Sequence, residues 1–178
     1  DSNLAMVIKS QTNIVIIGAG QLGSRHLQGL SMIKRAIKIT VIDPNPASLE
    51  IAQKRYEEMP ANKFVQSVIY AKTMHVLDKD VDVAVISTNA DVRRNAVEEL
   101  LKHVSVQFMI LEKVAFQSVE DFQTVIELLD KNKIKAWINC TRRMCPAFRK
   151  MRGELRKHEC IDFRLEGDNW GMACNTIH

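Results

Sequence analysis

The chain has 178 residues, of which 46% are hydrophobic and 26% charged, with only 7 glycines and 4 prolines. This composition is typical of a globular protein and argues against a disordered, collagen-like or disulfide-scaffold chain. No apolar run approaches the roughly 18 residues of a membrane-spanning helix. Residues 1–8 lack the basic flank and apolar core of a signal peptide, so we expect a leader that precedes the fold, with Met6 as the native start.

The four cysteines form no Cys-x-x-Cys pair and no zinc-like spacing with histidine. We therefore expect reduced thiols in a cytoplasmic protein, and no metal site. The net charge of +4 is concentrated in residues 141–158, where seven arginines and lysines accompany one acid, Glu154. Such a cluster suits nucleic acid, an acidic partner, a phosphorylated substrate or a solvated helix face. Because no aromatic interleaving or recognition motif accompanies the charge, we do not expect a nucleic-acid partner. The lack of a long apolar run argues against a membrane partner.

Apolar runs alternate with helical patterns along the chain. Continuous apolar runs predict strands that are buried on both faces, and the third run is weaker and suits an edge strand. The predicted strands are residues 14–17, 37–42, 63–69, 81–86, 106–111 and 134–140. The helix after the second strand is predicted to begin with Asn45 as N-cap and Pro46 at its first position. Ser118 and Asp121 resemble a capping box for the helix after the fifth strand.

This alternation predicts an α/β fold, a Rossmann-type doubly wound parallel sheet built from right-handed β-α-β units. Residues 160–166 differ because apolar and charged residues alternate strictly, as in an antiparallel strand with one wet face. We therefore predict a Rossmann domain over residues 9–157. Residues 158–178 are then the truncated start of a second, α+β domain.

The first predicted strand is followed directly by Gly18-Ala19-Gly20-Gln21-Leu22-Gly23, which opens the first helix. In a dinucleotide-binding fold, the first glycine permits the tight turn, the second lets the backbone approach a pyrophosphate, and the third lets helix and strand pack closely. Free N–H groups and the dipole of the helix N-terminus then hold the phosphates. The alternative interpretation is a glycine-rich turn that binds nothing.

Asp43 ends the second strand about 20 residues after the last glycine, the spacing expected of the acid that binds an adenosine ribose. A carboxylate accepts a hydrogen bond from a ribose hydroxyl but repels a 2′-phosphate, and no arginine follows Asp43 directly. The sequence therefore favours NAD over NADP. Alternatively, Asp43 only caps the strand.

Further motifs follow along the chain. They are His26, which extends the first motif to Gly-x-Gly-x-x-Gly-x-x-His, Ser87-Thr88-Asn89, Arg93, Glu112-Lys113-Val114, Asn139 to Pro146, and Cys174 to His178. In this order they resemble the Gfo/Idh/MocA family (glucose-fructose oxidoreductase, inositol dehydrogenase and MocA). The family has Thr-Pro-Asn, a common His, Glu-Lys-Pro, Asn-Arg-Arg-Phe-x-Pro and Asp-x-x-x-His at these places. Here Asn89 and Val114 replace prolines, Arg93 replaces the His, and Cys174 replaces the Asp.

The resemblance implies a two-domain NAD(P)-dependent oxidoreductase, a dehydrogenase of CH–OH groups in sugars, nucleotide sugars or polyols. Lys113 and His178 are its implied catalytic residues, with Lys113 also positioning the substrate. The second domain would form the substrate pocket and the oligomer interface, so we expect a homo-oligomer at full length and no activity from this cofactor-binding part alone. The cofactor-binding residues expected here are Gly18, Ala19, Gly20, Gln21, Leu22, Gly23, Asp43, Thr88, Asn89, Glu112 and Lys113.

Alternatives stay open for single residues. Lys113, just past the fifth strand, is either catalytic or a solvent-facing loop lysine. Arg142 and Arg143 either bind a substrate carboxylate or phosphate or are surface charge. His26 is interpreted as a helix residue packed near the glycine loop, and Trp137 as a core or interface residue. For the whole protein, a non-catalytic NAD-binding sensor or assembly subunit is the alternative to a dehydrogenase.

Overall fold

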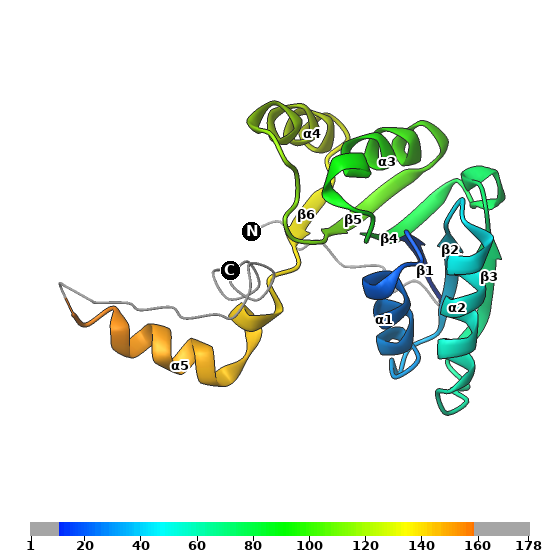
Figure 1. Ribbon diagram of the computed structural model, residues 1–178, viewed down its shortest axis with the longest axis horizontal. Helices are drawn as coiled ribbons and strands as arrows, with labels where there is room; N and C mark the ends of the chain where they lie inside the picture. Colours follow the sequence, from blue (N-terminus) through cyan, green and yellow to red (C-terminus); the bar gives the residue numbers. More distant parts are fainter. Residues whose placement is uncertain (1–10, 159–178) are drawn as a thin grey trace, which may run out of the picture. The chain divides into compact units, whose positions relative to one another are not determined.

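The computed structural model describes residues 11–158, which fall into two compact units that divide between Ile138 and Asn139. The first unit contains a six-stranded sheet in the order β3-β2-β1-β4-β5-β6, with all neighbouring strands parallel (Figure 1). This is the doubly wound order of the Rossmann fold, so the predicted fold class is confirmed. The strands are β1 (Thr12–Ile17), β2 (Ile37–Ile42), β3 (Val65–Ala71), β4 (Asp80–Ile86), β5 (Ser105–Leu111) and β6 (Lys135–Ile138).

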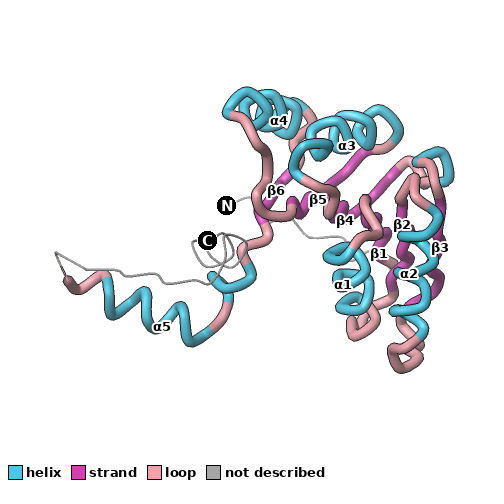
Figure 2. The backbone as a smooth tube through the Cα atoms, in the orientation of Figure 1, coloured by secondary structure: helices cyan, strands magenta, loops and turns pink. Residues whose placement is uncertain are grey.

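Four α-helices of the first unit cover the two faces of this sheet (Figure 2). The helices α1 (Gln21–Leu30) and α2 (Pro46–Glu57) pack on one face, and α3 (Ala90–His103) and α4 (Val119–Lys131) on the other. A short 3₁₀ turn, η1 (Met74–Val76), follows β3. Each helix connects parallel strands, which is why the sequence alternates between the two patterns.

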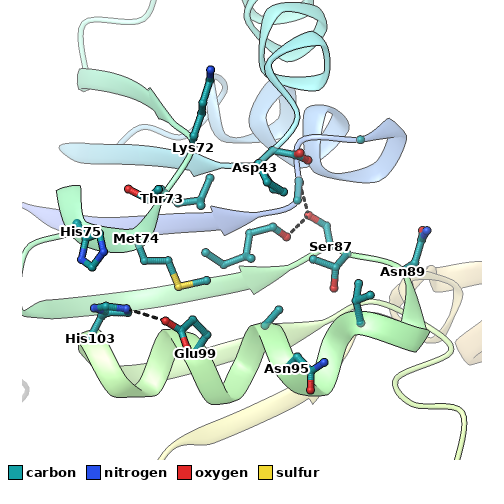
Figure 3. A pocket seen from close by; sticks show the side chains of 18 residues that line it. Asp43, Lys72, Thr73, Met74, His75, Ser87, Asn89, Asn95, Glu99 and His103 are labelled. Atoms are coloured by element: carbon teal, nitrogen blue, oxygen red, sulfur yellow. Dashed lines mark hydrogen bonds and ion pairs between the residues drawn. The ribbon is translucent and has the colours of Figure 1, made fainter.

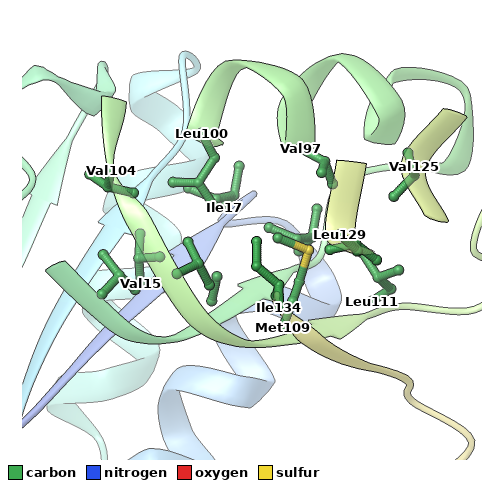
Figure 4. Packing of buried hydrophobic residues seen from close by; sticks show 14 of the residues in the cluster. Val15, Ile17, Val97, Leu100, Val104, Met109, Leu111, Val125, Leu129 and Ile134 are labelled. Atoms are coloured by element: carbon green, nitrogen blue, oxygen red, sulfur yellow. The ribbon is translucent and has the colours of Figure 1, made fainter. Parts of the chain in front are cut away.

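Buried residues of β1 alternate between the two layers of the core. Val15 and Ile17 pack with α3 and α4 residues (Figure 4), whereas Ile14 and Ile16 pack in the cluster that contains Leu27 of α1. Successive strand side chains point to opposite faces, so a strand covered on both sides needs an apolar residue at every position. This explains the continuous apolar run that begins the fold.

Leu100 of α3 is fully buried in the cluster that joins α3 to the sheet. We expect Leu100→Ala to lower the free energy of unfolding by about 2–5 kcal/mol, because it leaves a cavity in a packed core. Ile126 of α4 is 52% exposed, so Ile126→Ala is the matched control and should cost under about 1 kcal/mol. Urea denaturation measures both. Equal losses for the two variants would contradict the assigned core.

Two helix starts follow the predicted capping. The Asn45 side chain accepts a hydrogen bond from the Ala47 N–H at 3.0 Å, and Pro46 takes the first position of α2. The Ser118 hydroxyl accepts one from the Asp121 N–H at 3.0 Å at the start of α4. The Asp121 carboxylate also accepts a hydrogen bond from Arg94 of α3, with 3.0 Å between Nη1 and Oδ1. It therefore joins two helices, in addition to sitting in the first turn of α4.

The two edge strands differ from their predicted bounds. The third strand runs two residues further, to Ala71, and the sixth is only Lys135–Ile138. Trp137 is 54% exposed, so its interpretation as a core residue is wrong within the described part. An edge strand has one hydrogen-bonding neighbour, and apolar composition alone therefore sets neither its length nor its burial.

The second unit is described over residues 139–158. It contains the 3₁₀ turn η2 (Thr141–Met144) and the amphipathic helix α5 (Pro146–Leu155), none of whose residues is buried. Residues 160–166, the leader 1–8 and Trp170, which the sequence suggests as a core or domain-interface residue, lie outside the described residues. The predicted domain boundary at residue 157 therefore stays a prediction. Across residues 11–158, no helix has both the length and the apolar character that crossing a bilayer requires.

Candidate functional site

A cleft of about 750 Å³ opens at the carboxyl ends of β1, β2, β3 and β4. Its walls come from the loop after β1, the ends of β2 and β4, the segment from Lys72 to His75, and one side of α3 (Figure 3). The strand order reverses between β1 and β4, and ligands of open α/β sheets bind at such a switch point. The predicted residues Gly18, Gly20, Asp43, Thr88 and Asn89 line this cleft.

Gly18 and Gly23 are required by the fold itself. Gly18 has a φ of +95°, and a Cβ there would lie 2.9 Å from the Thr88 nitrogen. A Cβ on Gly23 would lie 1.8 Å from the Gly18 carbonyl oxygen, where no side chain fits. Because neither residue has a Cβ, α1 and the end of β4 can approach the glycine loop this closely. The roles predicted for these two glycines in turning and packing the chain are therefore consistent with the geometry.

Gly20 differs from the other two glycines of the loop. A Cβ there would meet no protein atom within 4 Å, although Gly20 lines the cleft. Its missing side chain therefore leaves space in the cleft rather than in the protein core. Gly20 is also the N-cap of α1, with no side chain that caps the helix and no acid in the first turn. The first N–H groups of a helix have no partner within it and attract anions. The loop thus fits a pyrophosphate group.

Asp43 ties the glycine loop to the end of β2. Its Oδ2 accepts the Ala19 N–H at 2.7 Å, and its Oδ1 accepts the Asn45 N–H at 2.9 Å. Each carboxylate oxygen can accept a further hydrogen bond, so the group retains capacity for a ribose hydroxyl. The side chain lies beside the loop in the cleft wall (Figure 3). The position fits an adenosine ribose next to the pyrophosphate.

Ser87 lines the cleft, although the sequence analysis named it only as part of a motif and not among the expected binding residues. Its hydroxyl donates to the Gly18 carbonyl oxygen at 2.8 Å and lies 3.1 Å from the Ile17 carbonyl oxygen. It therefore fastens the glycine loop to the end of β4. A small hydroxyl residue directly after a central strand was the available signal.

A second missed group lies at the β3 side of the cleft. His103 Nε2 is 2.9 Å from Glu99 Oε1, and the rings of His103 and His75 meet edge to face with 4.9 Å between centroids. Hydrogen bonds from His103 and Lys102 lower the pKa of Glu99. The spacing of Glu99 and His103 by four residues on α3 was the signal. Among residues 11–158, no three His, Cys, Asp or Glu side chains are placed to hold a metal ion.

Glu112 and Lys113 follow β5, at the same sheet edge but outside the volume of the cleft. Glu112 is 3% exposed, and its Oε1 lies 2.6 Å from Nε2 of His26 on α1. His26 is therefore a residue of α1 that contacts the segment after β5, and its packing near the glycine loop stays a prediction. The Lys113–Val114 peptide bond is cis. Whether these residues bind the cofactor stays a prediction. The predicted residues Ala19, Gln21, Leu22 and Gly23 also lie outside the cleft volume, in the loop and first turn of α1.

Arg93 is buried in α3, at 2% exposure. Its guanidinium donates hydrogen bonds to backbone carbonyl oxygens in the loops that follow β4 and β5. The acceptors are the carbonyl oxygens of Thr88, Glu112, Val114 and Ala115. Burial lowers the pKa of Arg93, and the nearby charges of Glu112 and Asp91 raise it. The sequence showed this position only as a departure from the family pattern.

The remaining predicted site residues belong to the second unit or lie outside the described residues. Arg143 is exposed in the second unit, and Arg142 lies in the same 3₁₀ turn. Substrate binding by either residue stays a prediction. Cys174 and His178 lie outside the described residues.

Comparison with known proteins identifies the family. Residues 12–140 match the model of the Gfo/Idh/MocA oxidoreductase family, NAD-binding Rossmann fold. Among solved structures, an oxidoreductase of this family from Vibrio cholerae is 23% identical with a TM-score of 0.61, covering 84% of this chain and 45% of that one. A putative myo-inositol dehydrogenase from Sinorhizobium meliloti is 20% identical with a TM-score of 0.59, covering 82% and 41%.

The WlbA dehydrogenase from Thermus thermophilus, in complex with NAD and UDP-GlcNAcA, is 14% identical with a TM-score of 0.63, covering 84% of this chain and 48% of that one. No curated protein matches the chain. The chain spans less than half the length of these three solved structures. These likenesses agree with the fold, and the family model covers most of the residues that the structure describes. The chain therefore belongs to the Gfo/Idh/MocA oxidoreductase family, with its NAD-binding Rossmann fold.

Proposed function

We propose that this chain is the cofactor-binding part of an NAD-dependent dehydrogenase that acts on a CH–OH group of a sugar, nucleotide sugar or polyol. The observation that carries the proposal is the open space above Gly20, at an uncapped helix N-terminus and beside the Asp43 carboxylate. This combination suits a pyrophosphate next to a ribose. The substrate class is supported by relatives whose descriptions name myo-inositol and UDP-GlcNAcA.

When bound, NAD supplies a carbon that accepts or returns a hydride. This chain contributes the groups that hold it and move the accompanying proton. The glycine loop binds the phosphates, and Asp43 accepts from a ribose hydroxyl. Lys113, at the carboxyl end of β5, takes the alcohol proton or polarises the carbonyl oxygen. His178 is the second acid or base, and Arg142 and Arg143 bind an acidic group of the substrate.

The wider assignments belong to the same proposal. Two cysteines in the described part, Cys140 and Cys145, are free thiols, which suits a cytoplasmic protein. A homo-oligomer and a second domain that completes the substrate pocket are proposed for the full-length protein. The competing candidate is a non-catalytic NAD-binding module. It is favoured by Arg93, a buried cation where the family resemblance has histidine.

Calorimetric titration of this chain with NADH and, in parallel, NADPH tests the binding part of the proposal. We expect saturable binding of NADH, and NADPH at least about tenfold weaker because Asp43 repels its 2′-phosphate. Binding of neither nucleotide, by a chain whose circular dichroism shows it folded, would contradict the proposal. The full-length protein is then assayed on a panel of sugars, polyols and nucleotide sugars. NADH binding without turnover of any of them favours the non-catalytic module.

A further inference from the structure

Arg93 joins two loops that are far apart in the sequence. Arg93 lies in the first turn of α3, just after the loop that follows β4. Its side chain reaches the loop that follows β5. One terminal nitrogen donates to the Thr88 carbonyl oxygen, while the other donates to the carbonyl oxygens of Glu112, Val114 and Ala115. The distance to the Ala115 oxygen is 2.9 Å. All these acceptors belong to the backbone, so the guanidinium fixes the paths of both loops.

A buried guanidinium needs such partners. Taking a charge out of water costs several kcal/mol unless hydrogen bonds and an opposite charge replace the solvent. Here the carbonyl dipoles and the buried carboxylate of Glu112 serve that purpose. Without the guanidinium, the carbonyl oxygens of Glu112 and Ala115 would lose this donor in buried positions, and those of Thr88 and Val114 in partly buried ones. The loops and the side chain therefore hold one another in a single arrangement.

The loop after β5 carries Lys113 between two of the clamped carbonyl groups, those of Glu112 and Val114. The loop after β4 carries Thr88, which lines the cleft. We propose that Arg93 is a positioning residue that holds Lys113 in register with the cofactor cleft. The inference deepens the proposed function, on which it rests for the role of Lys113. Val114 replaces the proline that follows the lysine in the family pattern. Hydrogen bonds from Arg93 to this loop can supply the constraint that the proline would have given.

The chemistry of the clamp is specific to arginine. A planar guanidinium presents five N–H donors on three nitrogens, so its two terminal nitrogens serve separate loops. Lysine keeps the charge but has one nitrogen, and histidine has two ring nitrogens on a shorter side chain. Neither reaches both loops with the same set of bonds. Arg93→Lys therefore removes the clamp while it retains the positive charge.

The test compares Arg93→Lys with Arg94→Lys. Arg94 is the next residue of α3, but it bonds to Glu98 and Asp121 and contacts neither loop, so it is a matched control. The first measurement is limited trypsin digestion, with cleavage after Lys113 followed by mass spectrometry. The second is calorimetric titration with NADH and with ADP-ribose, which lacks the nicotinamide. We expect Arg93→Lys to speed cleavage after Lys113 at least about tenfold and to weaken NADH about tenfold, with ADP-ribose affinity unchanged.

Each outcome tests one part of the proposal. Unchanged cleavage after Lys113 overturns the clamp. Faster cleavage at all lysines and arginines together shows that Arg93 supports the whole fold, which overturns its assignment as a positioning residue. Local cleavage with an unchanged ratio of NADH to ADP-ribose affinity overturns the link to the cofactor. If the unsubstituted chain binds ADP-ribose but not NADH, the proposed function is wrong. The digestion experiment still tests whether Arg93 holds the two loops, because it does not depend on NADH binding.

Discussion

Gly20→Ala is expected to weaken NADH binding about a hundredfold while leaving the free energy of unfolding nearly unchanged. The backbone of Gly20 has a φ of −63°, which alanine adopts without strain, and the new Cβ would meet no protein atom within 4 Å. The methyl group would instead occupy the space in front of the α1 N-terminus, where a pyrophosphate must approach the N–H groups closely. Titration calorimetry with NADH measures the loss of affinity, and urea denaturation measures stability.

Two further glycines give this experiment its controls. Gly29 also lies in α1 and has open space around a built Cβ, but it is not part of the cleft wall. Gly29→Ala should therefore leave NADH affinity unchanged and stabilise the helix slightly. Gly23→Ala, in contrast, should lower the free energy of unfolding, because its Cβ would lie 1.8 Å from the Gly18 carbonyl oxygen. Equal NADH affinities for the Gly20→Ala and Gly29→Ala proteins would contradict the assignment of the pyrophosphate site to this loop.

The contrast among these glycines also explains how much of the site could be predicted from the sequence. The glycine loop and Asp43 were identified because they lie within one β-α-β unit, where strand, turn and helix fix the positions of consecutive residues. Their spacing along the chain therefore determines their spacing in the structure. The parallel, doubly wound sheet followed in the same way from the alternating patterns. Asp43 indeed lies 2.7 Å from the Ala19 nitrogen in the loop that it was predicted to accompany.

Residues that depend on contacts between distant elements were not predictable in this way. Arg93 acts through carbonyl groups on two loops, and a charged residue on a helix is by default expected at the surface. Nothing local marks it as buried. His75 and His103 meet because η1 and the end of α3 border the same cleft, although 28 residues of sequence separate them. Such groups become visible only once the sheet order is known.

The length and burial of the edge strands could not be predicted for a different reason. Residues 134–140 are apolar enough for a central strand, yet only Lys135–Ile138 pair with β5, and Trp137 remains exposed. An apolar run predicts burial, but the burial must be supplied by whatever covers that edge of the sheet. Composition cannot specify that neighbour.

Asp43→Asn is expected to lower the preference for NADH over NADPH by at least about tenfold, mainly through a gain in NADPH affinity. The amide keeps one oxygen that can accept the Ala19 N–H, so the glycine loop should stay in place, but it removes the negative charge. Two like charges about 4 Å apart at a partly solvated site repel by about 1–4 kcal/mol, which sets the size of the expected change. Affinities for both nucleotides, measured by titration calorimetry at one ionic strength, give the ratio.

Asp130→Asn is the matched control for this charge change. Asp130 is an exposed residue near the end of α4, away from the cleft wall, so its substitution alters the net charge equally without altering the ribose site. It should leave the ratio of NADH to NADPH affinity unchanged, because exposed charges beyond about 10 Å are screened at ordinary salt. If Asp43→Asn weakens both nucleotides equally, the carboxylate serves only to hold the loop through the Ala19 N–H. Cofactor choice would then rest on another group in the cleft wall, and Lys72, which lines the same cleft just after β3, is the residue to test.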